Sequence, residues 1–245
     1  MVIPCYNEVP RLRPTLERLR PHLDGMGRPY EVIFVDDGSR DGTLLCLREA
    51  AGSWPQAQVV ALPVNTGKGW AVATGVRVSR GEVVLYSDAD LSTPIEELDK
   101  LEHALSAGAD VAFGSRCVSG AERAARPLYR RVMGRLFNAV VRAVLLPGFR
   151  DTQCGFKAFR GTVARELFAD LSTDGFAFDV EILWKARCAG LHLEEVSVRW
   201  RDSGTTRVSP VRDSLQMLRD VLALSAGRAR ARVTHSTGHD PAVHG

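Results

Sequence analysis

The stretch that decides the fold is Gly81–Pro94, with the sequence GEVVLYSDADLSTP. Its β-branched and aromatic residues predict a buried strand that ends at two carboxylates, Asp88 and Asp90. Ser92–Pro94 then predicts the start of a helix. Ligands of an open parallel sheet bind beyond the carboxyl ends of its strands, where Mg²⁺ is held by one or two carboxylates plus substrate phosphates. The alternative is a helix cap with an additional surface acid, and this stretch alone leaves both open.

Predicted strands and helices alternate from the beginning of the chain to Arg116. Strands are expected within residues 2–8, 30–35, 58–62, 82–87 and 110–116. This alternation predicts an α/β fold with a mainly parallel sheet and helices on both faces. Such a sheet brings three polar clusters, 6–8, 36–37 and 88–90, to the same edge, where they would suit a ligand with hydroxyls and phosphates. The absence of G-x-G-x-x-G argues against a dinucleotide cofactor.

The composition is that of an ordinary soluble protein with one large or two small domains. The chain has 245 residues, of which 45% are hydrophobic and 25% charged. The formal net charge of +3 is too small to indicate nucleic-acid binding. The five cysteines form no C-x-x-C pair, so neither a zinc site nor a disulfide framework is predicted. No apolar run reaches the ~18 residues that span a bilayer, and no secretory signal precedes the first strand. Whether the natural chain starts further upstream stays open.

The chain becomes strongly basic after residue 116. Residues 116–150 hold eight arginines and one acid, and apolar positions between Val132 and Leu145 mark one stripe of a helix. Its basic side is either a solvated face or a surface for an anionic membrane or acceptor. The further elements expected are a loop and strand at 150–160, a helix from 176, a strand at 194–200, a helix at 211–224 and a disordered tail at 226–245.

Six stretches together make the chain resemble the family 2 glycosyltransferases, which have the GT-A fold. Within the family it is most similar to the polyprenyl-phosphate sugar transferases, in particular the dolichyl-phosphate β-glucosyltransferases. The stretches are Val2–Glu8, Val35–Ser39, Asn65–Gly69, Ser87–Asp90, Gly114–Arg116 and Asp151–Lys157. The first four indicate the superfamily, while the last, together with Ser92–Pro94, indicates the lipid-phosphate branch.

The resemblance implies several groups of site residues. The nucleotide-sugar is expected to contact Pro4, Tyr6, Glu8, Asp37, Lys68, Asp88, Ala89 and Asp90. A Mg²⁺ or Mn²⁺ ion is expected on the D-x-D motif, Asp88 and Asp90. The acceptor phosphate is expected to contact Arg126, Arg130 and Arg131. The catalytic residues implied are Asp88, Asp90, Asp151 and Arg116. Asp151 is expected near the reacting sugar, and Arg116 near the diphosphate or the acceptor.

Two of these assignments, and the further candidate Asp179, also have a purely structural explanation. The helix start at Lys68 is equally explained by close packing of Gly67 and Gly69. Asp151 is otherwise a loop anchor, and Asp179 is either a catalytic base or a first-turn acid favoured by the helix dipole.

The implied activity is an inverting, metal-dependent transfer of a sugar, with glucose from UDP-glucose expected first, onto a polyprenyl monophosphate. The alternatives are a hydroxyl acceptor, a GDP-mannose-dependent mannosyl transfer to the same lipid, a nucleotidyltransferase and a non-catalytic nucleotide-sugar binder. A phosphate acceptor is mostly ionised at neutral pH and needs little help from a base, whereas a hydroxyl would need Asp151 or Asp179 as its base. Val196 stands where the Gln-x-x-Arg-Trp motif needs its Gln, which argues against a polymerising enzyme.

One catalytic domain is expected over residues 1–225, with 1–116 as the nucleotide-sugar-binding half and 117–225 as the acceptor-binding half. Related enzymes often carry a transmembrane helix, which this chain lacks. We therefore expect a cytoplasmic protein held peripherally on the cytoplasmic face of a membrane by its amphipathic helices, by a partner or by an upstream segment. The oligomeric state, the acceptor lipid and the choice between Mg²⁺ and Mn²⁺ stay open.

Overall fold

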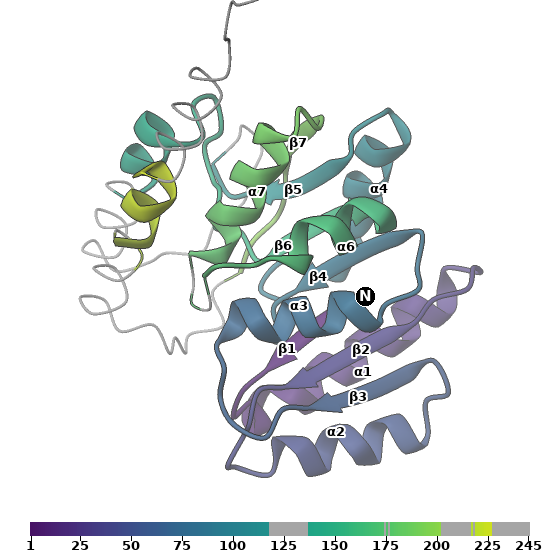
Figure 1. The fold of residues 1–245 in the computed structure, drawn as a ribbon. Coiled ribbons are helices and arrows are strands. Elements are labelled where there is room, and N and C mark those ends of the chain that lie inside the picture. The colour runs from purple at the N-terminus through teal and green to yellow at the C-terminus, as the bar shows by residue number, and fades with distance from the viewer. Residues whose placement is uncertain (118–136, 174, 176, 202–216, 218, 227–245) are drawn as a thin grey trace, which may run out of the picture.

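A single seven-stranded sheet forms the centre of the molecule. The computed structural model describes residues 1–117, 137–173, 175, 177–201, 217 and 219–226. The strand order is β3-β2-β1-β4-β6-β5-β7, and only β6 runs against the others (Figure 1). The strands are β1 Val2–Cys5, β2 Val32–Asp36, β3 Ala57–Ala61, β4 Val83–Ser87, β5 Val111–Ser115, β6 Phe156–Arg160 and β7 Leu193–Ser197.

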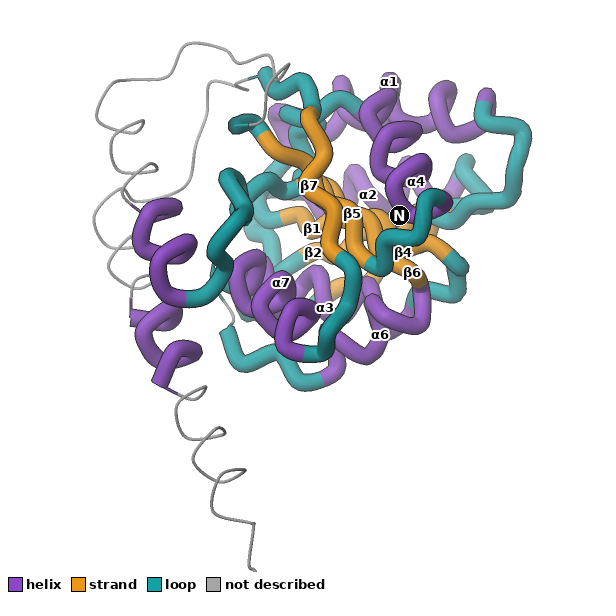
Figure 2. Tube along the Cα trace, turned by 90° about the horizontal axis from the view of Figure 1, so that it is seen from above, coloured by secondary structure: helices purple, strands orange, loops and turns teal. Residues whose placement is uncertain are grey.

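Helices cover both faces of the sheet, as Figure 2 shows. The helices are α1 Val9–Gly25, α2 Thr43–Gly52, α3 Lys68–Val78, the 3₁₀ turn η1 Ile95–Glu97, α4 Leu98–Ser106, α6 Gly161–Ala169 and α7 Phe178–Cys188. One apolar core joins α1, α2 and α4 to the sheet, and the other joins α3, α6 and α7 to its opposite face. The predicted α/β fold with a mainly parallel, two-sided sheet is confirmed.

The buried strands explain why both faces must be covered. All five residues of β2 are buried, with Val32 and Phe34 in one core and Ile33 and Val35 in the other. A strand that buries both sets of side chains has the continuous apolar sequence typical of parallel sheets.

The position of β6 differs from the simple alternation that the sequence predicts. β5 does not pair with β4, because β6 lies between them and is antiparallel to both. Reaching this slot requires a chain that returns from the second half of the sequence, a long-range pairing that local patterns do not encode. As a result, the loop before β6 lies at the edge where β4 and β5 end.

The structure differs from the sequence prediction at one helix and at the end of one strand. Helix α6 has no counterpart in the prediction, although Ala164, Leu167, Phe168 and Leu171 are buried at helical spacing. β7 ends at Ser197, three residues before the predicted strand end.

Two further helical segments, residues 137–144 and 219–226, lie side by side in Figures 1 and 2, and their buried residues belong to the α3 side core. The three predicted acceptor arginines, half of the predicted 211–224 helix and the tail from residue 227 on lie outside the described residues. In the described part of the chain, no helix is both long and apolar enough to cross a bilayer.

Candidate active site

The strand ends that carry the predicted site residues meet at one edge of the sheet. β1 is parallel to β2 and β4, and β4 and β5 both run antiparallel to β6, so all four end at this edge. The turn after β4 carries Asp88 and Asp90 and is closed by a 3.2 Å hydrogen bond from the Leu91 N–H to the Asp88 carbonyl. Leu91 has a φ of 45°. This left-handed backbone is strained for a branched residue, and such strain is typical of functional sites.

Asp88 forms an ion pair with Lys68 at the start of α3. The Lys68 Nζ atom lies 2.6 Å from Asp88 Oδ1, and the two side chains are 20% and 40% exposed. The same Nζ lies 5.7 Å from the ring centroid of Tyr86 and 5.6 Å from that of Phe178, within cation–π reach. Burial alone would lower the pKa of Lys68, but the nearby carboxylates, Asp88 foremost, outweigh it and raise that pKa.

Arg11 joins Asp90 to Glu8. Its guanidinium lies 3.3 Å from Asp90 Oδ2 and 2.7 Å from Glu8 Oε2. The other oxygen of Asp90 accepts a hydrogen bond of 2.9 Å from the Ser92 N–H. One cation in the first turn of α1 therefore orients a carboxylate from each of two neighbouring strand ends.

Gly155 brings the loop before β6 directly against Asp88. The Gly155 carbonyl accepts a hydrogen bond of 3.1 Å from the Asp88 N–H. A Cβ atom at position 155 would lie 2.1 Å from Asp88 Oδ2 and 2.4 Å from its Cγ. The register of the antiparallel pair, in which Ser87 faces Phe156, produces this close approach. Only glycine fits here while Asp88 keeps its position.

Asp151 and Arg116 form a bidentate ion pair. Arg116 Nε donates to Asp151 Oδ2 at 2.7 Å, Nη2 donates to Oδ1 at 2.8 Å, and the Arg116 N–H donates to Oδ2 at 2.9 Å. Burial would raise the pKa of Asp151, but the Arg116 guanidinium outweighs it and lowers that pKa to about 2. A carboxylate of such low pKa is a weak proton acceptor at neutral pH.

Glu195 on β7 holds the backbone of this ion pair. Its carboxylate accepts hydrogen bonds from the N–H groups of Arg150, at 2.9 Å, and Asp151, at 2.8 Å. The centroid of the Trp200 ring lies 5.8 Å from the guanidinium carbon of Arg116. The ion pair is thus held by two groups from one stretch of the chain, β7 and the residues just after it.

Asp179 belongs to a second buried cluster, beneath the turn. Lys157 is completely buried, and its Nζ lies 2.5 Å from Asp179 Oδ1 and 2.6 Å from the Cys154 carbonyl oxygen. Tyr86 donates its hydroxyl hydrogen to the same Asp179 oxygen. Burial, and then the charge of Asp179, raise the pKa of Tyr86 well above its ordinary value. Lys157 reaches the cluster because the strand register places it opposite Tyr86.

The two aspartates at the end of β2 have different surroundings. Both Asp37 oxygens accept hydrogen bonds from the 65–67 loop, from the N–H groups of Thr66 and Gly67 at 2.7 Å and 3.0 Å among others. Asp36 is also buried, and its Oδ1 has no hydrogen-bond partner within the described part of the chain. Asp36 is therefore a candidate ligand-binding residue. The sequence placed it in the 36–37 polar cluster but assigned it no role of its own.

The structure brings most of the predicted residues together at this edge. Glu8 and Asp90 meet at Arg11, Lys68 contacts Asp88, and Arg116 contacts Asp151. Pro4 and Tyr6 lie half-buried at and just after the end of β1, and the buried Ala89 accepts a 2.6 Å hydrogen bond from Thr15. The residues that sequence reasoning did not assign to the site are Arg11, Asp36, Gly155, Lys157 and Glu195. Asp36, Gly155 and Lys157 did carry a signal, because they lie within the Val35–Ser39 and Asp151–Lys157 stretches.

Asp88 and Asp90 fit a Mg²⁺ or Mn²⁺ ion that is bound together with phosphates. Both are hard oxygen donors on one short turn, and the Asp88 side chain is 40% exposed. Within the described residues, no group of three or more His, Cys, Asp or Glu side chains could hold a metal. The protein would then supply two ligands and the phosphates of a bound nucleotide would supply others, which is the usual arrangement for Mg²⁺.

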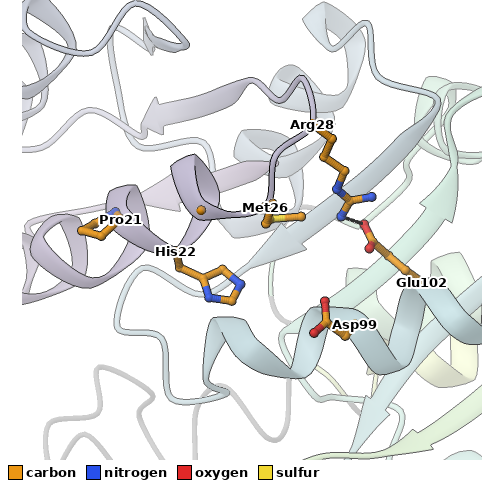
Figure 3. A pocket seen from close by; sticks show the side chains of 7 residues that line it. Pro21, His22, Met26, Arg28, Asp99 and Glu102 are labelled. Atoms are coloured by element: carbon orange, nitrogen blue, oxygen red, sulfur yellow. Dashed lines mark hydrogen bonds and ion pairs between the residues drawn. The ribbon is translucent and has the colours of Figure 1, made fainter.

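A separate surface hollow lies between the end of α1 and α4, away from these residues (Figure 3). It is lined by Pro21, His22, Gly25, Met26, Arg28, Asp99 and Glu102. Arg28 and Glu102 form an ion pair across it. None of the predicted site residues lines this hollow.

Comparison with known sequences identifies close relatives over most of the chain. The model of the family described as glycosyl transferase family 2 matches residues 1–168. The dolichyl-phosphate β-glucosyltransferase of Drosophila melanogaster is 37% identical over 239 residues, which cover 91% of this chain and 73% of that protein. The human dolichyl-phosphate β-glucosyltransferase is 34% identical over 236 residues, with the same two coverages.

Solved structures share the fold at lower sequence identity. Mannosyl-3-phosphoglycerate synthase from Rubrobacter xylanophilus is 20% identical with a TM-score of 0.68, and the match covers 99% of this chain and 77% of that one. Glucosyl-3-phosphoglycerate synthase from Mycobacterium tuberculosis, in complex with Mn²⁺, UDP-glucose and phosphoglyceric acid, is 20% identical with a TM-score of 0.66, covering 92% and 78%.

Proposed function

The chain belongs to glycosyl transferase family 2 and has the GT-A fold, and from that premise we propose that it transfers glucose from UDP-glucose to a polyprenyl monophosphate of the dolichyl type. The names of its relatives support both the sugar and the acceptor. In this reaction an acceptor phosphate oxygen attacks the anomeric carbon, the bond from that carbon to the diphosphate breaks, and UDP leaves with inversion at the carbon.

The observation that carries the choice of acceptor is that the two carboxylates predicted as possible bases, Asp151 and Asp179, are already engaged. Asp151 is held by three hydrogen bonds from Arg116, and Asp179 is held by Lys157 and Tyr86. A hydroxyl acceptor needs a base to remove its proton, whereas a phosphate with a second pKa of about 6 is mostly ionised at neutral pH. The geometry therefore favours a phosphate acceptor.

The other residues at the strand-end edge are assigned to two tasks, binding the uridine and stabilising the leaving diphosphate. The uridine would be held by Pro4, Tyr6, Asp36 and Asp37. Glu8 would also contact the uridine while it remains bound to Arg11. Lys68 and Arg116 place positive charge where the leaving diphosphate gains negative charge, a form of stabilisation that usually contributes most to catalysis.

A Mg²⁺ or Mn²⁺ ion on Asp88 and Asp90 would supply further positive charge to the diphosphate when bound. We assign residues 1–116 to donor binding and 117–225 to acceptor binding, with Arg126, Arg130 and Arg131 gripping the acceptor phosphate. The tail at 226–245 is assigned no part in the reaction. We also propose that the protein works peripherally on the cytoplasmic face of a membrane.

The proposed function is tested by product chemistry. The protein is incubated with a panel of labelled UDP- and GDP-sugars and polyprenyl phosphate, and the products are extracted into organic solvent. Label from UDP-glucose should enter the organic phase and be released by mild acid, because a glycosyl phosphate is acid-labile. An acid-stable product would indicate a hydroxyl acceptor, label from GDP-mannose alone would indicate a mannosyl transfer, and no transfer would contradict the proposal.

The site assignment is tested by Asp90→Ala, with Asp99→Ala as the matched control. Asp99 is an exposed aspartate on α4, and its replacement should leave the rate unchanged. Asp90→Ala should abolish turnover by removing a metal ligand. Near-normal rates in this variant with added Mg²⁺ or Mn²⁺ would refute the assignment.

A further inference from the structure

The ion pair between Lys68 and Asp88 occupies one of the two carboxylates expected to bind metal. Lys68 Nζ lies 2.6 Å from Asp88 Oδ1, and neither side chain is fully buried. The rings of Tyr86 and Phe178 lie beneath the ammonium group and stabilise it where it is. Lys68 is therefore already bound as a counter-ion to Asp88, the first aspartate of the D-x-D motif.

The second acid has its own internal cation, so the turn is close to neutral before any ligand binds. Asp90 and Glu8 share the guanidinium of Arg11. Three carboxylates and two cations leave these five side chains with a formal charge of −1. A divalent cation arriving alone would compete with Lys68 for Oδ1 of Asp88 and would have to bind close to the positive charges of Lys68 and Arg11.

A nucleoside diphosphate changes this balance because it brings several negative charges to the same place. Its phosphate oxygens can accept the hydrogen bonds of the ammonium group that leaves Asp88. They can also complete the coordination of the cation, for which the protein offers two ligands.

We propose that Lys68 is an internal counter-ion that closes Asp88 to a divalent cation until a nucleoside diphosphate arrives, so that cation and nucleotide bind together. This inference deepens the proposed function and rests on it, because it takes Asp88 and Asp90 as the metal ligands and UDP as the nucleotide. Its consequence is that Lys68 couples the two binding events, beyond contributing charge to the donor phosphates.

The test measures binding of Mn²⁺, without turnover, by electron paramagnetic resonance of the free ion. Wild-type protein, Lys68→Met and the control Lys100→Met are titrated with Mn²⁺, each with and without UDP. Met keeps most of the apolar stem of Lys68 over the two rings and removes the ammonium group. Lys100 is also paired with a carboxylate, Glu97, but lies on α4 outside the site. Circular dichroism confirms that each variant is folded, and Lys68→Gln serves as a second replacement.

Wild-type protein and Lys100→Met should bind Mn²⁺ weakly alone and about tenfold more tightly with UDP. Lys68→Met should bind Mn²⁺ alone about tenfold more tightly than wild type, because a neighbouring positive charge is gone, and UDP should then strengthen Mn²⁺ binding much less. If Lys68→Met binds Mn²⁺ alone no more tightly than wild type, the inference is overturned while the proposed function stands. If wild-type protein binds no Mn²⁺ even with UDP, the assignment of Asp88 and Asp90 as metal ligands fails, and the inference with it.

Discussion

Replacing Gly155 by alanine should damage the reaction far more than the fold. The new Cβ atom would lie 2.1 Å from Asp88 Oδ2, 2.5 Å from Oδ1 and 2.4 Å from Cγ, whereas Cβ atoms essentially never approach such atoms within 3.0 Å. The loop cannot easily retreat, because the Gly155 carbonyl is hydrogen-bonded to the Asp88 N–H. The carboxylate of Asp88 must therefore turn away by roughly 1 Å, and a misplacement of that size at a reacting centre costs about 100-fold in rate.

The cost in stability should be smaller. Overpacking of a well-filled site costs about 1–3 kcal/mol. The clashing atoms form the end of a short side chain that is 40% exposed and can rotate toward solvent. We therefore expect a loss of about 1 kcal/mol, at the low end of that range, beside a loss of about 2.7 kcal/mol in transition-state stabilisation.

The assay compares kcat/KM for sugar transfer with the free energy of unfolding from urea denaturation. Gly52→Ala is the matched control, because a Cβ atom at Gly52, the last residue of α2, would meet no atom within 4 Å. The control should keep full activity and stability. Full activity in Gly155→Ala, or a loss of activity fully accounted for by unfolding, would refute the reasoning.

Three further changes test the groups around this site. Asp151→Asn should remove a pH-dependent stabilisation: the folded pKa of about 2 lies below the ordinary 3.8, so the carboxylate contributes about 2 kcal/mol above pH 4 and loses it as the pH falls from 4 to 2. In urea unfolding, a difference between variant and wild type that stays constant across that window would contradict this. Asp179→Asn should cost about 3–5 kcal/mol by leaving the buried Lys157 without its partner, while Lys157→Met combined with Asp179→Leu should cost less than the sum of the single changes. Simple additivity in chemical denaturation would show that the two side chains do not interact. Glu195→Ala should lower kcat about tenfold with little change in donor KM, since it releases the backbone that positions Asp151, and Glu195→Gln should recover most of the loss; an unchanged kcat in the alanine variant would count against this positioning role.

The sequence by itself determined the α/β class and where the polar strand ends lie. These features are local: the apolar run of β2, the alternation of strands and helices and the D-x-D turn after β4 are each encoded within a few consecutive residues. Resemblance added the family, because several short motifs occur in the right order. Helix α6 was within reach of the same reasoning, since its buried residues follow helical spacing.

Only the tertiary structure decided which charges are free and which are paired. Arg116 and Asp151 are 35 positions apart, Arg11 and Asp90 are 79 apart, and Tyr86 and Asp179 are 93 apart. Each pair meets because a strand order and a register bring distant segments together, above all the insertion of antiparallel β6 between β4 and β5. A sequence pattern of period two or 3.6 specifies which face of an element is buried. The charged group that lies opposite that face depends on non-local pairing, so the same carboxylates that sequence reasoning offers as possible bases are found in the fold as members of ion pairs.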